Sequence, residues 1–182
     1  FPNKEIQKEI SNYLKDYYTT IFNIPTESLG DLTLLLDQVF FEKNNNKISE
    51  IFREVFAPKL AILIKDLQVY TNDDDLTIKG VFGNEDLMHS LLNNIAIQIV
   101  NAKFASERYT TKTDGSKGRA DIVIAKNNKG IVIEMKYNAK DAKIALEQAK
   151  DYAELVKDND IKIFMGCNIT DQQEVFISGE IV

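Results

Sequence analysis

The sequence predicts an α/β protein with an N-terminal helical region, and two observations lead to this fold class. Over about the first 80 residues, apolar side chains recur mostly at the spacing of amphipathic helices. From Asn84 onward, apolar runs of strand length alternate with helical patterns in the order helix, three strands, helix, two strands. We therefore expect a helical region over residues 1–80 and an α/β core over residues 81–182.

The composition is that of an ordinary globular protein. With 182 residues, of which 44% are hydrophobic and 27% charged, the chain is long enough to bury one sizeable core. No run approaches the roughly 18 apolar residues that a membrane-spanning helix needs, so we expect no membrane association. The single cysteine, Cys167, lies in an apolar run. This usage argues against a disulfide framework and favours a reducing, cytoplasmic location.

The net charge of −6 is unevenly distributed along the chain. Residues 1–100 hold 9 Lys and Arg against 15 Asp and Glu, whereas residues 101–160 hold 12 against 10. The overall charge argues against a simple basic protein that coats nucleic acid. The second segment is nevertheless mildly basic.

Helical spacing appears three times in the N-terminal region. It predicts one helix from Lys4 to Phe22, a second from Leu29 to Phe41 and a third from about Ile48 to Phe56. Pro58 is expected to end the third helix. The apolar stretch Leu60–Leu67 fits either a helix or a strand.

The C-terminal region begins with a helix from Asn84 whose apolar positions run to Val100. A strand is expected next, and then a polar loop over residues 110–117 leads into a β-hairpin. The predicted strands, hairpin and helix are Lys103–Tyr109, Gly118–Asn138, Ala139–Val156, Ile161–Cys167 and Glu174–Ser178.

Three charged residues interrupt the apolar strands of this hairpin. Because strand side chains alternate between faces, Glu134 and Lys136 share one face, and antiparallel pairing lets Asp121 come opposite them. Two converging carboxylates repel each other unless something neutralises them. Mg²⁺ prefers such oxygen ligands, and a neighbouring ammonium group can orient water or stabilise charge on a phosphate. The pattern therefore favours a divalent-cation site.

Asp121 and the later Glu134-Met135-Lys136 resemble the Asp…(Asp/Glu)-x-Lys signature of the PD-(D/E)xK nuclease superfamily. Ala120 stands where that signature usually has proline. Downstream, Gln148-Ala149-Lys150-Asp151-Tyr152 resembles the Gln-x-x-x-Tyr motif of the branch that includes recombination exonucleases. This resemblance implies a restriction-endonuclease-like core, with a central mixed β-sheet flanked by helices.

The order of four further segments is similar to the nuclease-like domain at the C-terminus of bacterial AAA-ATPase-like proteins. These segments are Gly-Arg-Ala-Asp, Glu-Met-Lys, Ala-Leu-Glu-Gln-Ala and Ile-Phe-Met-Gly-Cys-Asn. The likeness implies nucleic acid, in the first place DNA, as substrate, and an ATPase domain in the same longer chain.

The resemblance also implies a role for each candidate residue. Asp121, Glu134 and the carbonyl of Met135 would hold Mg²⁺ or Mn²⁺, and Lys136 would position or activate the attacking water. Gln148 and Tyr152 would support the site or hold substrate. The remaining candidates near the metal are Glu85, His89 and Glu107.

Two alternatives stay open at this point. The first is a nuclease-like fold that has become a catalytically silent binding or interaction module. The second is the nuclease domain of a bacterial toxin that an antidote protein controls.

Lys117 and Arg119 fit phosphate contacts or an ordinary solvated loop equally well.

Overall fold

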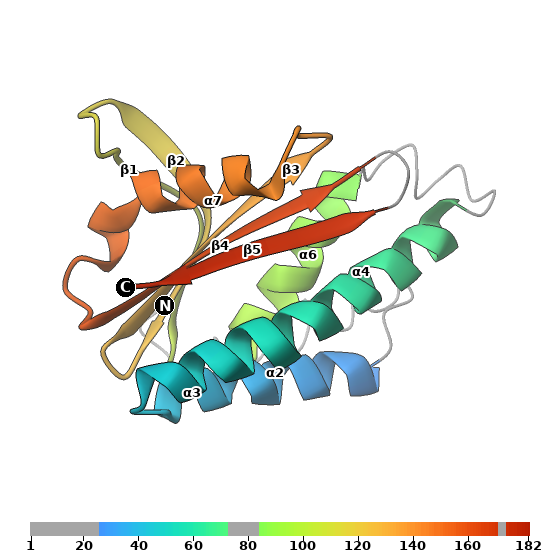
Figure 1. Ribbon diagram of the computed structural model, residues 1–182, viewed down its shortest axis with the longest axis horizontal. Coiled ribbons are helices and arrows are strands. Elements are labelled where there is room, and N and C mark those ends of the chain that lie inside the picture. The colour runs from blue at the N-terminus through green and yellow to red at the C-terminus, as the bar shows by residue number, and fades with distance from the viewer. Residues whose placement is uncertain (1–25, 73–83, 171–173) are drawn as a thin grey trace.

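A mixed five-stranded sheet forms the centre of the structure (Figure 1). The computed structural model describes residues 26–72, 84–170 and 174–182. β3 and β4 run parallel, and the other neighbouring pairs run antiparallel. In their order across the sheet, the strands are β1 (Lys103–Thr111), β2 (Lys117–Lys126), β3 (Lys129–Tyr137), β4 (Ile161–Ile169) and β5 (Val175–Ile181).

Helices cover both faces of this sheet, as Figure 1 shows. One face carries α7 (Ala142–Asp151) and the 3-10 turn η2 (Ala153–Val156), which connect β3 to β4. The other face carries α2, α4 and α6, and a short helix and a π-helical turn connect α2 to α4. In chain order these are α2 (Thr26–Phe41), α3 (Asn45–Glu50), η1 (Ile51–Phe56), α4 (Ala57–Asn72) and α6 (Asn84–Ile97). Among the described helices, none is long and apolar enough to cross a membrane.

The larger hydrophobic core is shared between the N-terminal helices and the sheet. Leu36 of α2, Phe52 of η1 and Leu60 of α4 lie in one buried cluster with Ile95 of α6 and Ile133 of β3. Alternation along β3 sends its odd-numbered side chains into this cluster and its even-numbered ones toward α7. The boundary expected at residue 80 lies outside the described residues and stays a prediction.

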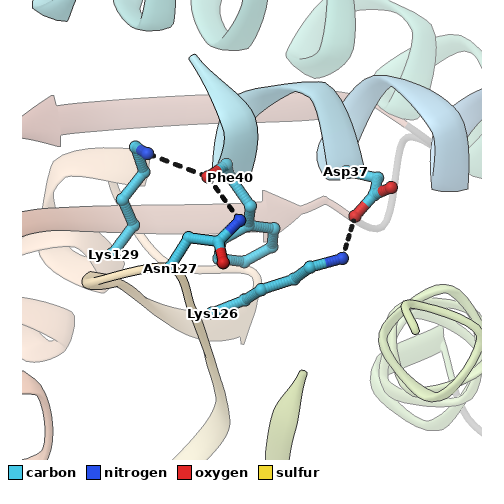
Figure 2. Close-up of polar contacts among 5 residues, drawn as sticks. All are labelled: Asp37, Phe40, Lys126, Asn127 and Lys129. Atoms are coloured by element: carbon cyan, nitrogen blue, oxygen red, sulfur yellow. Dashed lines mark hydrogen bonds and ion pairs between the residues drawn. The ribbon is translucent and has the colours of Figure 1, made fainter. Parts of the chain in front are cut away.

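The turn between β2 and β3 is anchored to the end of α2, as Figure 2 shows. The buried Lys129 ammonium donates a 2.8 Å hydrogen bond to the Phe40 carbonyl, and the Asn127 amide donates to the same oxygen at 3.2 Å. Lys126 forms a 2.7 Å ion pair with Asp37. Carbonyls in the last turn of a helix lack partners within the helix, so these donors cap α2. They also fix where the hairpin lies.

The helix predicted from Leu29 to Phe41 is confirmed as α2, and the ambiguous Leu60–Leu67 stretch is helical, within α4. The expectation that Pro58 ends a helix is wrong. Pro58 lies in the first turn of α4, where its missing N–H costs little. Just before it, the Ala57 N–H donates to the Phe52 carbonyl five residues earlier, in π-helical geometry. The first predicted helix, Lys4 to Phe22, lies outside the described residues.

The C-terminal elements follow the predicted order with shifted boundaries. α6 ends at Ile97, so Val100 lies beyond the helix and is exposed. The helix expected from Ala139 begins only at Ala142, because Asn138 has a positive φ of 55° and the Asp141 carboxylate accepts the Lys143 N–H as an N-cap. It ends at Asp151, where the 3-10 turn follows.

Candidate active site

The register of the β2–β3 hairpin brings the two candidate carboxylates together. Asn127 and Asn128 both have positive φ, 53° and 62°, as the central residues of a tight two-residue hairpin turn require. From this turn the strands pair as far as Ile122 opposite Ile133. One residue further along each strand lie Asp121 and Glu134. The turn therefore determines which residues face each other, since a slip of one residue would move every side chain to the opposite face.

Each carboxylate accepts a hydrogen bond from the backbone of the other strand. The Asp121 N–H donates to Glu134 Oε1 at 2.8 Å, and the Met135 N–H donates to Asp121 Oδ2 at 2.9 Å. At the point where regular pairing of β2 with β3 stops, carboxylate oxygens thus take the place of the backbone carbonyls as hydrogen-bond acceptors between the two strands. Amide donors of this kind stabilise ionised carboxylates.

The direction of side chains along β2 changes at Asp121. Ala120 packs in the cluster beneath α7, whereas Ile122 packs in the cluster on the other side of the sheet. Regular alternation would put both on the same face. The chain is therefore twisted around Asp121, which is half-buried, while the Glu134 side chain is only 4% exposed.

The local electrostatics penalise a second negative charge. Burial, and next the neighbouring charge of Asp121, raise the pKa of Glu134 from 4.5 to about 8. The half-buried Lys136 ammonium opposes this rise. On the adjacent strand, burial and then the charge of Asp121 raise the pKa of Cys167 to about 12. A cation at this point would relieve the repulsion between the two carboxylates.

The residues present fit a divalent metal ion in part. Two carboxylates within reach of each other's backbone are the hard oxygen donors that Mg²⁺ and Mn²⁺ favour. The Met135 side chain is buried in the core, so only its backbone is left to serve the site. In the described part of the chain, His, Cys, Asp and Glu form no group of three or more that could hold a metal.

The described atoms do not show whether Glu85, His89 and Glu107 add to this set of metal ligands. Glu85 and His89 belong to the N-terminal half of α6, and Glu107 belongs to β1. Their side chains lie outside the part of the chain that the structure describes, so their roles stay predictions.

Tyr152 and Gln148 occupy different surroundings. Tyr152 follows the last residue of α7, is 7% exposed and packs in the cluster that includes Ala120. Its ring lies so close to Gly118 that a Cβ there would come within 2.8 Å of it. Tyr152 thus supports the strand that carries Asp121. Gln148 is half-buried and lines a shallow groove on the outer side of α7, so its link to the site stays a prediction.

Two features of the site were missed by the sequence reasoning. Gly166 of β4 pairs with Glu134, and α7 crosses it so closely that an added Cβ would lie 2.2 Å from the Leu146 nitrogen. Tyr109, near the end of β1, is 76% exposed beside Arg119. The first depends on packing that a single sequence does not show. The second was available from strand pairing, had the hairpin formed by β1 and β2 been recognised.

Comparison with known proteins adds no relative. No protein-family model matches the chain, and no curated protein matches it at a significant level.

Proposed function

We propose that this protein is a metal-dependent nuclease that hydrolyses DNA phosphodiester bonds at Asp121, Glu134 and Lys136. The observation that carries the proposal is the reciprocal pair of hydrogen bonds between the carboxylates and the opposite backbone. It gathers two acids beside a lysine where two strands part. A carboxyl group with a strongly raised pKa next to a second acid is typical of functional sites.

The finer fold belongs to the same proposal. A helix-connected parallel pair, β3 and β4, extended by antiparallel β2 and β1 on one side, is compatible with a restriction-endonuclease-like core. Asp121 lies on β2 and Glu134 and Lys136 lie on β3, the two strands of the central hairpin, which supports the proposal.

Each of the candidate residues would have its own role in the reaction. Asp121, Glu134 and the Met135 carbonyl would hold Mg²⁺ or Mn²⁺. When bound, such an ion polarises the phosphoryl oxygen and lowers the pKa of water. The Lys136 ammonium would orient the attacking water and stabilise the charge that builds on the phosphate. The water would give up a proton to solvent as its oxygen bonds to phosphorus, the bond from phosphorus to the leaving oxygen would break, and that oxygen would take up a proton from solvent. Tyr152 would hold β2 in place, and Gln148 would support the site.

A cleavage assay on linear and circular DNA with Mg²⁺ or Mn²⁺ tests the proposal. Asp121→Ala and Lys136→Ala are expected to lower the cleavage rate by at least about 100-fold, because each removes a group that acts on the reacting atoms. Asp66→Asn and Lys65→Ala change exposed charges on α4 and serve as matched controls that should cleave like wild type. Equal activity in wild type and both site variants would rule out this site.

A second candidate function rests on the same hydrogen bonds. Because each carboxylate already accepts a backbone amide, the pair can close the hairpin as a purely structural feature. The protein would then be a binding or interaction module with a nuclease-like fold. Such a module would show no saturable Mn²⁺ binding that depends on Glu134.

A further inference from the structure

We propose that the outer face of the β1–β2 hairpin binds single-stranded nucleic acid, with one base stacked on Tyr109 beside the cleavage site. The inference rests on the proposed function, because it supplies the surface on which the substrate approaches Asp121. It adds the class of substrate, an unpaired strand, and the residues that hold it.

Strand pairing places the relevant residues in one row. Tyr109 lies opposite Arg119, and Thr111 lies opposite Lys117. Gly118 and Ala120 face Tyr152 and α7, so alternation turns Lys117 and Arg119 to the other face. Arg119 is two residues from Asp121 on the same strand, a separation of about 7 Å. A phosphate held by Arg119 would therefore have its neighbour close to the carboxylates.

Tyr109 presents its ring to solvent. The side chain is 76% exposed, more than any other large hydrophobic side chain of the described residues. The Arg119 guanidinium carbon lies 5.9 Å from the ring centroid, in cation–π range. An aromatic ring exposed at the surface and flanked by a cation is the arrangement that stacks an unpaired base.

The charge of the hairpin differs from that of the whole chain. Residues 108–119 contain four Lys or Arg residues and one Asp, whereas the chain as a whole carries −6. Lys117 is exposed and donates from its ammonium to Thr111 Oγ1 at 3.2 Å, which holds it on the same face as Arg119. A locally positive surface on an acidic protein concentrates a polyanion at one place.

The ring selects for an unpaired strand. In a duplex the bases stack on one another and present only their edges in the grooves, so Tyr109 would have no free base face to cover. In a single strand every base offers such a face, and phosphates alternate with it for Arg119 and Lys117. We therefore expect single strands to bind more tightly than a duplex of the same sequence.

Fluorescence anisotropy with a 5′-fluorescein-labelled DNA oligonucleotide tests this, in EDTA so that metal-dependent cleavage does not interfere. Tyr109→Ala is expected to raise the Kd for the single strand by between about 5-fold and 150-fold, and Tyr109→Phe to keep it near wild type. Phe176→Ala is the matched control. Phe176 is 48% exposed and lies on β5, the opposite edge of the sheet, so its loss should leave the Kd unchanged. An RNA strand of the same sequence should show the same Tyr109 dependence, because stacking does not use the 2′-hydroxyl.

The inference would be overturned by a Tyr109→Ala protein that binds the single strand like wild type, or by a Phe176→Ala protein that loses as much affinity as Tyr109→Ala. Duplex binding as tight as single-strand binding would also contradict it. If the protein binds single strands in a way that depends on Tyr109 but never cleaves DNA, the binding surface is supported and the proposed nuclease function is rejected. If the protein cleaves DNA but its Kd for single strands does not depend on Tyr109, the nuclease function is supported and the binding surface is rejected.

Discussion

At the scale of single residues, Glu134 is the group of the site whose ionised form its surroundings disfavour most clearly. Its side chain is almost fully buried, one amide donates to it, and the charge of Asp121 lies nearby. Burial and Asp121 raise its pKa, whereas the amide and the Lys136 ammonium act in the opposite direction. A carboxyl group in this position costs stability when it ionises. That cost is understandable where a bound cation would offset it.

Glu134→Gln is expected to remove a pH-dependent loss of stability. With the folded-state pKa raised from 4.5 to about 8, the folded protein keeps a proton that the unfolded chain releases. The contribution of Glu134 to the free energy of unfolding is therefore fully present below about pH 4.5 and is lost as pH rises to about 8. The loss amounts to a few kcal/mol.

Urea denaturation in EDTA at about pH 5 and about pH 8.5 measures this difference. Glutamine cannot ionise, so the free energy of unfolding of the variant should rise relative to that of wild type as pH rises. The exposed Glu50 on α3 provides the control, and Glu50→Gln should follow wild type at both values. If Glu134→Gln also followed wild type, the burial and charge assigned to Glu134 would be incorrect.

At the scale of elements, the close approach of α7 to β4 holds the site from one side. Gly166 pairs with Glu134 in the parallel register, and the backbone of Leu146 and Ala145 crosses directly over it. A side chain at this position would push α7 away from the sheet. The strand and the helix could each be predicted from their own patterns, but this contact joins residues 20 apart and follows only from packing.

Gly166→Ala is expected to lower the free energy of unfolding by about 1–3 kcal/mol, because the new Cβ would lie 2.2 Å from the Leu146 nitrogen and the backbone there cannot move aside. Gly30→Ala is the matched control. Gly30 lies within α2 with no atom within 4 Å of an added Cβ, so alanine should raise stability by up to about 1 kcal/mol. Urea denaturation of both variants checks the opposite signs, and equal effects would contradict the packing argument.

The sequence predicts element order better than element ends, and particular residues show why. Alternation predicts that Glu134 and Lys136 share one face, and hairpin pairing predicts that Asp121 lies near Glu134, where the hydrogen bonds place it. The sequence does not decide the role of Pro58, because proline is tolerated in the first turn of a helix as well as beyond its end. The late start of α7 depends on the positive φ of Asn138, which an asparagine permits but does not require.

At the scale of the whole molecule, the N-terminal helices and the sheet that carries the site are built together. They share the larger core, and Asn127 and the buried Lys129 join the end of α2 to the turn that fixes the hairpin register (Figure 2). Neither contact is visible in the sequence, because a lysine beside a turn is usually exposed. The helices are thus placed to stabilise the geometry on which Asp121 and Glu134 depend.

Calorimetric titration of the whole protein with Mn²⁺ tests the central claim, that the paired carboxylates form a divalent-cation site. At about pH 8, where Glu134 can lose its proton, wild type and the control Asp66→Asn should bind Mn²⁺ saturably. Glu134→Gln should weaken that binding by at least about 10-fold, because it removes one of the two carboxylates. Absence of saturable binding to wild type, or unchanged binding to Glu134→Gln, would contradict the claim.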